Sequence, residues 1–298
     1  MAKAYVLYNP LAGNGHCKKF LEQLKNMLTD EAVFCDMTKD GTYEKLFYEP
    51  TDDDYIILCG GDGTLNRFIN LTDEVEIDRE ILYFPTGSGN DFAHDLGKHS
   101  GDAPFSITEY IKDLPLVEVN NKKYRFINGI GYGIDGYCCM VGDEIRKKSD
   151  KAVNYTSIAI KGLLFHYKPT NACITIDGNV HMYNKVWLAP TMNGRFYGGG
   201  MMPAPNQKRN NSNGELSVMV MHGSGKLKTL MLFPSIFKGE HINHEKTVKI
   251  LKGHEIKVEF DSPTALQIDG ETILNVTSYK AYYPKHVYNN ATVMAQRA

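Results

Sequence analysis

Short apolar runs alternate with helix-like spacings through the first hundred residues of the chain. Four such runs end in turns rich in Gly, Asn, Asp and Pro, and between them apolar residues recur at intervals of three and four. Strands that alternate with helices are typical of a parallel, doubly wound sheet, whose central strands are buried on both faces. The pattern predicts strands at residues 4–8, 32–35, 55–59 and 81–84, and helices at 20–28 and 65–71.

After about residue 115 the pattern becomes that of antiparallel strands. Two pairs of strand-like runs are joined by Asn120-Asn121 and Asp177-Gly178, which are turn residues typical of β-hairpins. Further strands are predicted at residues 216–221, 247–251, 256–260 and 265–268, and helical segments near 137–167 and 226–238. The fold class is therefore predicted as an N-terminal doubly wound α/β domain at 1–118 and a C-terminal antiparallel β-sandwich domain at 119–285, with room for the tail 286–298 to return to the first domain.

Composition narrows the class of protein. The 298 residues are enough for two domains with cores of their own, and a net charge of -2 excludes a globally basic nucleic-acid binder. No stretch approaches the roughly 20 apolar residues that span a bilayer, and the strand pattern at the N-terminus leaves no room for a signal peptide. The six cysteines are scattered without a CxxC pair, as expected for reduced thiols, so the sequence predicts a cytoplasmic protein.

The strongest chemical signal follows the third predicted strand, in the segment Gly60-Gly61-Asp62-Gly63-Thr64-Leu65-Asn66. Glycines let a backbone approach a phosphate closely, and the N-terminus of a following helix adds N–H donors. A carboxylate repels bare phosphate, so Asp62 fits beside a phosphate-bound Mg²⁺ or near a nucleophile. The alternative is a tight strand-to-helix turn in which Asp62 serves as a helix cap.

The same physical pattern follows the fourth predicted strand, in Pro85-Thr86-Gly87-Ser88-Gly89-Asn90-Asp91. Ser88 and Asn90 can bond phosphate oxygens, and Asp91 is a candidate for a metal or for the substrate hydroxyl; alternatively, Asp91 opens a helix after a capped turn. A weaker turn of this kind, Asn9-Pro10, ends the first strand. Because ligands of parallel sheets bind beyond the carboxyl ends of the strands, these turns predict one shared nucleotide site.

GGDGTLN followed by PTGSGNDFA resembles the diacylglycerol kinase catalytic-domain family, which includes bacterial soluble lipid kinases and the sphingosine and ceramide kinases. The resemblance covers essentially the whole chain and is specific in this combination, although GGDGT alone also occurs in NAD kinases. It implies an NAD kinase-like α/β domain, a β-sandwich domain, and ATP and Mg²⁺ as cofactors. The positions expected to contact ATP are Asn9, Gly13, Thr38, Gly60, Gly61, Asp62, Gly63, Thr64, Asn66, Thr86, Gly87, Ser88 and Asn90.

The resemblance also implies the catalytic residues. Asp62 and Asp91 match essential acidic positions of the family, Asp62 through the ATP-bound Mg²⁺. Glu271 matches the general base in the pattern (apolar)-x-(apolar)-D-G-E, read here as Leu266 to Glu271. From the residues alone, Asp269-Gly270 is a hairpin turn and Glu271 is merely the residue after it. Asp135 matches an aspartate that supports the family's site.

Two departures from the family pattern stand out. His94 replaces a basic residue after NDFA, which puts the support around Asp135 in doubt, and Asn213 replaces an aspartate of a structural Mg²⁺ site. Because Mg²⁺ favours carboxylates, we expect that structural metal to be absent or weak.

The expected function is an ATP-dependent lipid kinase that phosphorylates the hydroxyl of diacylglycerol or a related lipid. Two alternatives stay open: a kinase for another alcohol (sphingoid, polyprenol or NAD), and a non-catalytic nucleotide- or lipid-binding relative. The expected partners are a lipid alcohol substrate and a transient, peripheral membrane contact at the cytoplasmic side, without nucleic acid; a homodimer stays open. Residues 227–237 and Met201-Met202 are candidate membrane contacts, with core or cleft lining as their alternative.

Overall fold

The computed structural model describes residues 2–10, 17–39, 42, 51, 53–72, 78–148, 153–209 and 213–284. The chain divides into two compact units, residues 1–113 and 114–298. Gly13 and the tail 286–298, both named among the expectations, lie outside the described residues.

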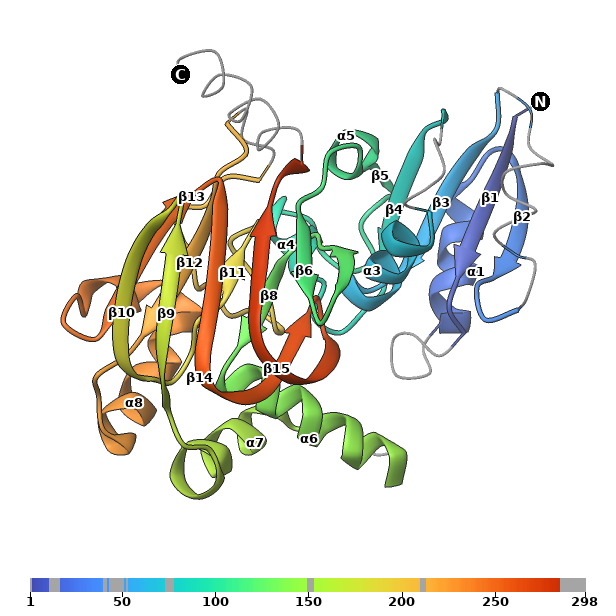
Figure 1. Cartoon of the computed structure of the whole chain (residues 1–298). Helices are drawn as coiled ribbons and strands as arrows, with labels where there is room; N and C mark the ends of the chain where they lie inside the picture. Colours follow the sequence, from blue (N-terminus) through green and yellow to red (C-terminus); the bar gives the residue numbers. More distant parts are fainter. Residues whose placement is uncertain are drawn as a thin grey trace, which may run out of the picture. The chain divides into compact units, whose positions relative to one another are not determined.

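The first unit is built on a five-stranded sheet with the strand order β2-β1-β3-β4-β5 (Figure 1). Strands β1 to β4 pair in parallel and β5 runs antiparallel to β4, so the four predicted strands and their parallel arrangement are confirmed. Parallel strands end at the same edge of a sheet, which brings the turns after β1, β2, β3 and β4 to one side. The elements are β1 (Lys3–Tyr8), α1 (Cys17–Met27), β2 (Glu31–Asp36), β3 (Tyr55–Gly60), α3 (Asp62–Leu71), β4 (Ile81–Pro85), α4 (Asp91–Asp95), β5 (Phe105–Ser106) and α5 (Thr108–Ile111).

Strand β3 explains why the turns at this edge are well supported. Ile56, Ile57 and Leu58 are fully buried, because β3 lies between β1 and β4. Leu24 of α1 packs with Ile57 and Phe84 in one apolar cluster, which fixes the sheet against that helix. Burial of such side chains contributes about 1.5–3 kcal/mol each relative to exposure.

The second unit is an antiparallel β-sandwich formed by ten strands. The main path is β13-β12-β11-β8-β14-β15-β6-β7, while β9 pairs with β14 and β10 pairs with β9. Both predicted hairpins, β6–β7 and β9–β10, are confirmed. The strands are β6 (Leu116–Val119), β7 (Lys122–Arg125), β8 (Gly129–Tyr132), β9 (Thr170–Ile176), β10 (Asn179–Val186), β11 (Thr191–Met192), β12 (Leu216–Met221), β13 (Val248–Gly253), β14 (Glu255–Ile268) and β15 (Glu271–Tyr282).

Helices α6, α7 and α8 gather on one side of the sandwich (Figure 1). They share an apolar cluster with β12 that includes Ile134, Leu163, Met219 and Leu232, and the predicted helical segments are thereby confirmed. The helices are α6 (Ile134–Lys148), α7 (Tyr155–Lys161), the π-helical turn η2 (Gly162–His166), α8 (Lys226–Leu232), and the 3₁₀ segments η3 (Phe233–Lys238) and η4 (Glu240–Asn243).

Strand β14 differs from its prediction. The sequence predicts two strands, at 256–260 and 265–268, whereas the structure has one strand of 14 residues. Its pairing with β15 shifts register between Glu259 and Thr264, and Pro263 lies inside this irregularity. Proline lacks an N–H for the ladder and is tolerated at such bulges, so the strand bends there without ending.

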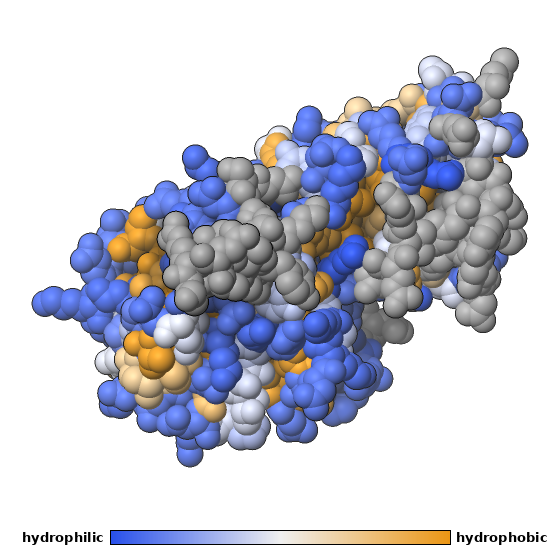
Figure 2. All heavy atoms as spheres, turned by 45° about the horizontal axis from the view of Figure 1, so that its top comes forward, coloured by the Kyte–Doolittle hydropathy of each residue, from blue (hydrophilic) through white to orange (hydrophobic). Residues whose placement is uncertain are grey.

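No helix among the described residues is long and apolar enough to cross a membrane. On the face drawn in Figure 2, hydrophilic residues cover most of the described surface, and hydrophobic residues gather in small patches.

Candidate active site

The two glycine-rich turns of the first unit touch each other through their backbones. A Cβ on Gly87 would lie 2.5 Å from the Cα of Gly61, and a Cβ on Gly61 would lie 2.9 Å from the Cα of Gly87. The turns are also tied by the Thr86 N–H, which donates to the Gly60 carbonyl at 2.8 Å. The sequence placed both turns at one sheet edge, and the structure brings them into direct contact.

Asp62 joins the two turns by capping the helix that follows the second one. Its two carboxylate oxygens accept the N–H groups of Asp91 and Phe92, each at 2.9 Å. These are the first N–H groups of α4. The N-cap residue of α4, Asn90, does not accept them with its own side chain. Asp62 therefore does act as a helix cap, as the alternative interpretation proposed. The helix that it caps is α4, however, and not α3, of which Asp62 is the first residue.

Asn90 shapes the second turn from within. Its backbone is left-handed, with φ 51°, and its side-chain amide exchanges two hydrogen bonds with Gly87, one to the N–H at 2.9 Å and one to the carbonyl at 2.8 Å. Asparagine is one of the few residues that adopts this conformation readily. The side chain therefore holds the turn closed, while its contact with phosphate stays a prediction.

Other residues predicted to bind ATP follow the same edge. Asn9 comes directly after β1 and is half-buried, while Thr38 follows β2 and donates its hydroxyl to Asp36 at 2.7 Å. Gly63 and Ser88 are exposed. Thr64, Asn66, Thr86 and Asp91 are buried, so these side chains belong to the packed base of the turns rather than to their outer surface.

The contact between the turns makes Gly87→Ala a sharp test of the geometry. Its Cβ would also meet the Oδ1 of Asn90 at 2.7 Å, so the backbone or the Asn90 bonds must yield. We expect the free energy of unfolding to fall by about 1–3 kcal/mol, the usual cost of overpacking, in chemical denaturation monitored by circular dichroism.

Gly63→Ala is the matched control, because a Cβ there meets nothing within 4 Å and Gly63 lies in α3. Alanine is the better helix former, so stability should stay level or rise by about 0.4–1 kcal/mol. Equal stability of the Gly87 variant and the wild type would contradict the close approach of the turns.

In the second unit, the β14–β15 turn is held by the carboxylate of Asp269. Asp269 and Gly270 both have positive φ, 47° and 98°, and Ile268 pairs with Glu271 across a two-residue hairpin turn. The Asp269 carboxylate accepts the N–H groups of Ile127, Asn128 and Gly129 at 2.6, 2.9 and 2.9 Å. The hairpin interpretation of Asp-Gly is confirmed, and it presents Glu271 as the exposed first residue of β15.

Asp135 lies in the first turn of α6 and is buried close to this hairpin. Tyr197 donates its hydroxyl to the Asp135 Oδ2 at 2.8 Å. Burial raises the pKa of the Asp135 carboxyl to about 6, and the hydrogen bond from Tyr197 opposes that rise. The side chain of Gln267 lies beside Asp135 and accepts the Gly270 N–H at 2.7 Å, so Asp135 is linked to the turn that carries Glu271.

The sequence pattern indicated Asp269 only as a turn residue and not the contacts of its carboxylate, and it did not indicate Tyr197 or Arg209. Arg209 donates to the Ile127 carbonyl and, at 2.9 Å, to the Asn128 side chain, on the segment that Asp269 also binds. The signal for Asp269 was available, since it stands two residues before Glu271 in the recognised motif. Nothing in the local pattern indicated Tyr197 or Arg209.

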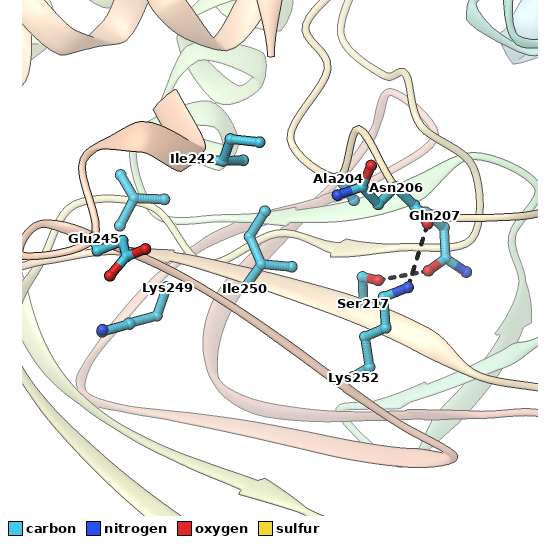
Figure 3. Close-up of a pocket in the computed structure, with 10 residues that line it drawn as sticks. Ala204, Asn206, Gln207, Ser217, Ile242, Glu245, Lys249, Ile250 and Lys252 are labelled. Atoms are coloured by element: carbon cyan, nitrogen blue, oxygen red, sulfur yellow. Dashed lines mark hydrogen bonds between the residues drawn. The ribbon is translucent and has the colours of Figure 1, made fainter. Parts of the chain in front are cut away.

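A pocket of about 440 Å³ lies elsewhere in the second unit, beside β12 and β13 (Figure 3). Its buried polar side chains are already paired, because the Ser217 hydroxyl donates to Gln207 Oε1 at 2.5 Å and Gln207 donates to the Glu215 carbonyl at 2.9 Å. Lys252 donates to the Asn206 carbonyl at 3.3 Å. None of the residues predicted to act in catalysis lines this pocket.

Within the described part of the chain, no group of three or more His, Cys, Asp or Glu side chains gathers in a way that could hold a metal ion. Asn213 and His94, the two residues that depart from the family pattern, are both exposed.

Comparison with known families matches both units. Residues 3–116 match the diacylglycerol kinase catalytic domain, and residues 128–288 match the YegS C-terminal NAD kinase beta sandwich-like domain. A fold of two units, with glycine turns at one edge of a parallel sheet and a β-sandwich after it, is therefore that of a lipid kinase of the diacylglycerol kinase type. The chain belongs to the diacylglycerol kinase-like family and is a kinase of that class.

Relatives with similar sequences cover nearly the whole chain. The diacylglycerol kinase of Mycobacterium tuberculosis (strain ATCC 25618 / H37Rv) is 26% identical over 271 residues, which are 87% of this chain and 85% of that protein. The diacylglycerol kinase of Bacillus subtilis (strain 168) is 25% identical over 284 residues, 91% of this chain and 90% of that protein. A crystal structure of a diacylglycerol kinase from Bacillus anthracis str. Sterne has the same fold, with a TM-score of 0.60, 22% identity, and coverage of 94% and 93% of the two chains.

Proposed function

We propose that this chain transfers the γ-phosphoryl group of ATP to the hydroxyl of diacylglycerol. The observation that carries the proposal is the paired glycine turn, in which Gly61 and Gly87 meet without side chains and Asp62 caps α4 across the contact. This arrangement offers backbone N–H groups and the exposed Gly63 and Gly89 to a polyphosphate at the carboxyl ends of four parallel strands. The names of the relatives from Mycobacterium tuberculosis and Bacillus subtilis point to the same acceptor.

The first unit would bind and orient the nucleotide. Gly61 is the N-cap residue of α3 and has no side chain to cap it, so a phosphate oxygen can accept N–H groups of the first turn. Asp62 is only half-buried, and its carboxylate oxygens are of the kind that Mg²⁺ prefers, so Asp62 would fit an ATP-bound Mg²⁺. Bound Mg²⁺ would neutralise charge on the transferring phosphate. Because Asp62 is fixed by two N–H groups, it keeps its place without the nucleotide.

The second unit would supply the general base. Glu271 is exposed at the start of β15, and the turn before it is fixed by three N–H bonds to Asp269. Glu271 would accept the proton of the lipid hydroxyl as its oxygen attacks the γ-phosphorus. The lipid alcohol and a brief, peripheral membrane contact at the cytoplasmic face are the partners that this reaction requires.

The proposal is tested by a lipid-panel kinase assay with the purified full chain, labelled ATP and Mg²⁺. We expect labelled phosphate in phosphatidic acid when dispersed diacylglycerol is the acceptor. Sphingoid bases, a polyprenol and NAD are offered in parallel. Transfer to one of these instead of diacylglycerol would change the proposed acceptor but leave the proposed kinase activity in place. Absence of transfer to every alcohol would favour a non-catalytic relative and defeat the proposal.

A further inference from the structure

Three large apolar side chains protrude from neighbouring elements of the second unit. Phe165 of η2 is 72% exposed, and Leu227 and Met231 of α8 are 70% and 74% exposed. The two elements are joined by Lys226, whose ammonium donates to the Leu164 carbonyl at 2.9 Å. Helices α7 and α8 lie on the same side of the sandwich in Figure 1.

Helix α8 is apolar on two faces rather than one. Thr229 and Leu232 are buried against the unit, whereas Leu227 and Met231, four residues apart, share the opposite face. A surface helix normally places polar residues there. The exposed apolar face therefore calls for a partner outside the unit, and we call Phe165, Leu227 and Met231 the apolar tip.

The charged residues around the apolar tip indicate whether that partner carries negative or positive charge. Residues 161–168 and 226–231, which contain the tip, carry four lysines (161, 168, 226 and 228) and no Asp or Glu, in a chain whose net charge is -2. The lysines at 161, 168, 226 and 228 are exposed. Positive charge concentrated around protruding apolar groups complements an anionic surface into which such groups can insert.

We infer that the surface formed by α7, η2 and α8 docks onto an anionic lipid bilayer, with the apolar tip inserted among the acyl chains and the lysines among the head groups. A fluid bilayer suits single protruding side chains, since it adapts to their shape. The inference deepens the proposed function, because a kinase whose acceptor is embedded in a bilayer must reach that surface. Of the two candidate contacts, residues 227–237 provide this surface through Leu227 and Met231, whereas Met201 is buried.

Vesicle sedimentation with the full chain tests this docking without nucleotide or diacylglycerol. Wild-type protein should partition onto vesicles of phosphatidylglycerol mixed with phosphatidylcholine, and added salt should weaken that binding. The double variant Leu227→Ser with Met231→Ser should lower the partition coefficient at least about tenfold, given the apolar area lost. Lys168→Gln with Lys228→Gln should lower it by a similar factor on anionic vesicles alone.

The matched control replaces two exposed apolar residues away from the apolar tip. Val180 and Met182 of β10 are 62% and 69% exposed, so Val180→Ser with Met182→Ser changes the surface to the same degree. It should bind vesicles within about twofold of wild type. All variants alter exposed positions, and unchanged thermal unfolding confirms that they are folded.

Several outcomes decide the inference separately from the proposed function. Wild-type binding by the Leu227/Met231 variant, or an equal loss in the β10 control, would overturn it. A change of oligomeric state in ultracentrifugation, with vesicle binding intact, would assign the apolar tip to a second copy and overturn it too. Selective loss of activity on vesicle-embedded diacylglycerol, with activity on a water-dispersed short-chain diacylglycerol retained, would support it. Selective loss of vesicle binding in a chain that phosphorylates no lipid would support the docking while refuting the proposed function.

Discussion

The Glu271→Gln variant is expected to lose turnover by about 10²–10⁴-fold while unfolding at the wild-type temperature. Glutamine keeps the size and the hydrogen-bonding shape of the side chain but cannot accept the hydroxyl proton. Glu271 is exposed, and the turn before it is held by Asp269 rather than by Glu271 itself, so stability should be unaffected. The measurement is kcat for labelled phosphate transfer to diacylglycerol, together with a thermal melt.

Glu240→Gln serves as the control, since Glu240 is an exposed carboxylate on η4 of the same unit. Its turnover should match the wild type. A Glu271→Gln enzyme that worked at nearly the wild-type rate would show that another group takes the proton. The kinase assignment would survive that result, but the assignment of the base would not.

Asp62→Ala is expected to abolish measurable turnover and also to destabilise the first unit. The substitution removes the acceptor of two N–H groups at the start of α4. Hydrogen bonds to charged acceptors contribute about 1.5–3 kcal/mol each, and a buried N–H left without a partner costs about 1–3 kcal/mol. We therefore expect the free energy of unfolding to fall by about 2–4 kcal/mol, measured in urea without nucleotide, with kcat lowered by at least about 10³-fold.

Measurement without nucleotide separates the two roles of Asp62. If Asp62 acted only on a nucleotide-bound metal, the nucleotide-free protein would be as stable as the wild type. Asp78→Ala provides the comparison, because Asp78 is an exposed carboxylate of the same unit whose removal should change neither quantity. Loss of activity with wild-type stability would contradict the capping role that the structure shows.

Strand β3 was readily predicted because its burial is nearly uniform. β3 is buried from Ile56 through Gly60, and a run of apolar residues marks such a strand without further information. The bounds of β15 were not predicted, because its buried residues follow no regular alternation and its exposed residues include an apolar one. The buried residues are Val276, Tyr279, Ala281 and Tyr282, and the exposed ones are Glu271, Leu274, Asn275 and Thr277. The sequence pattern predicted two strands, at 256–260 and 265–268, where β14 instead continues through a bulge that contains Pro263.

Of the candidate site, the two glycine-rich turns and their common sheet edge could be predicted from the sequence. Glycines after β3 and β4 marked two phosphate-like turns, and the parallel pattern placed them at one edge. Which side chains tie the turns together could not be derived, because Asp62 reaches residues 29 and 30 positions later in the chain. The same holds for Asp269, whose partners are 140 to 142 residues earlier. Contacts of this length depend on the finished packing and leave no periodic trace in the sequence.

The long separation in sequence between Asp269 and its partners sets an order of events during synthesis on the ribosome. The first unit ends at residue 113, so its parallel sheet can close as soon as that segment has emerged. Residues 127–129 must wait about 140 residues for Asp269, which is roughly 7–28 s at 5–20 residues per second. Throughout that interval β8 lacks its β14 partner, since Leu266, Gln267 and Ile268 have not yet been made. The nascent second half is thus the part of this kinase that chaperones have the longest opportunity to bind.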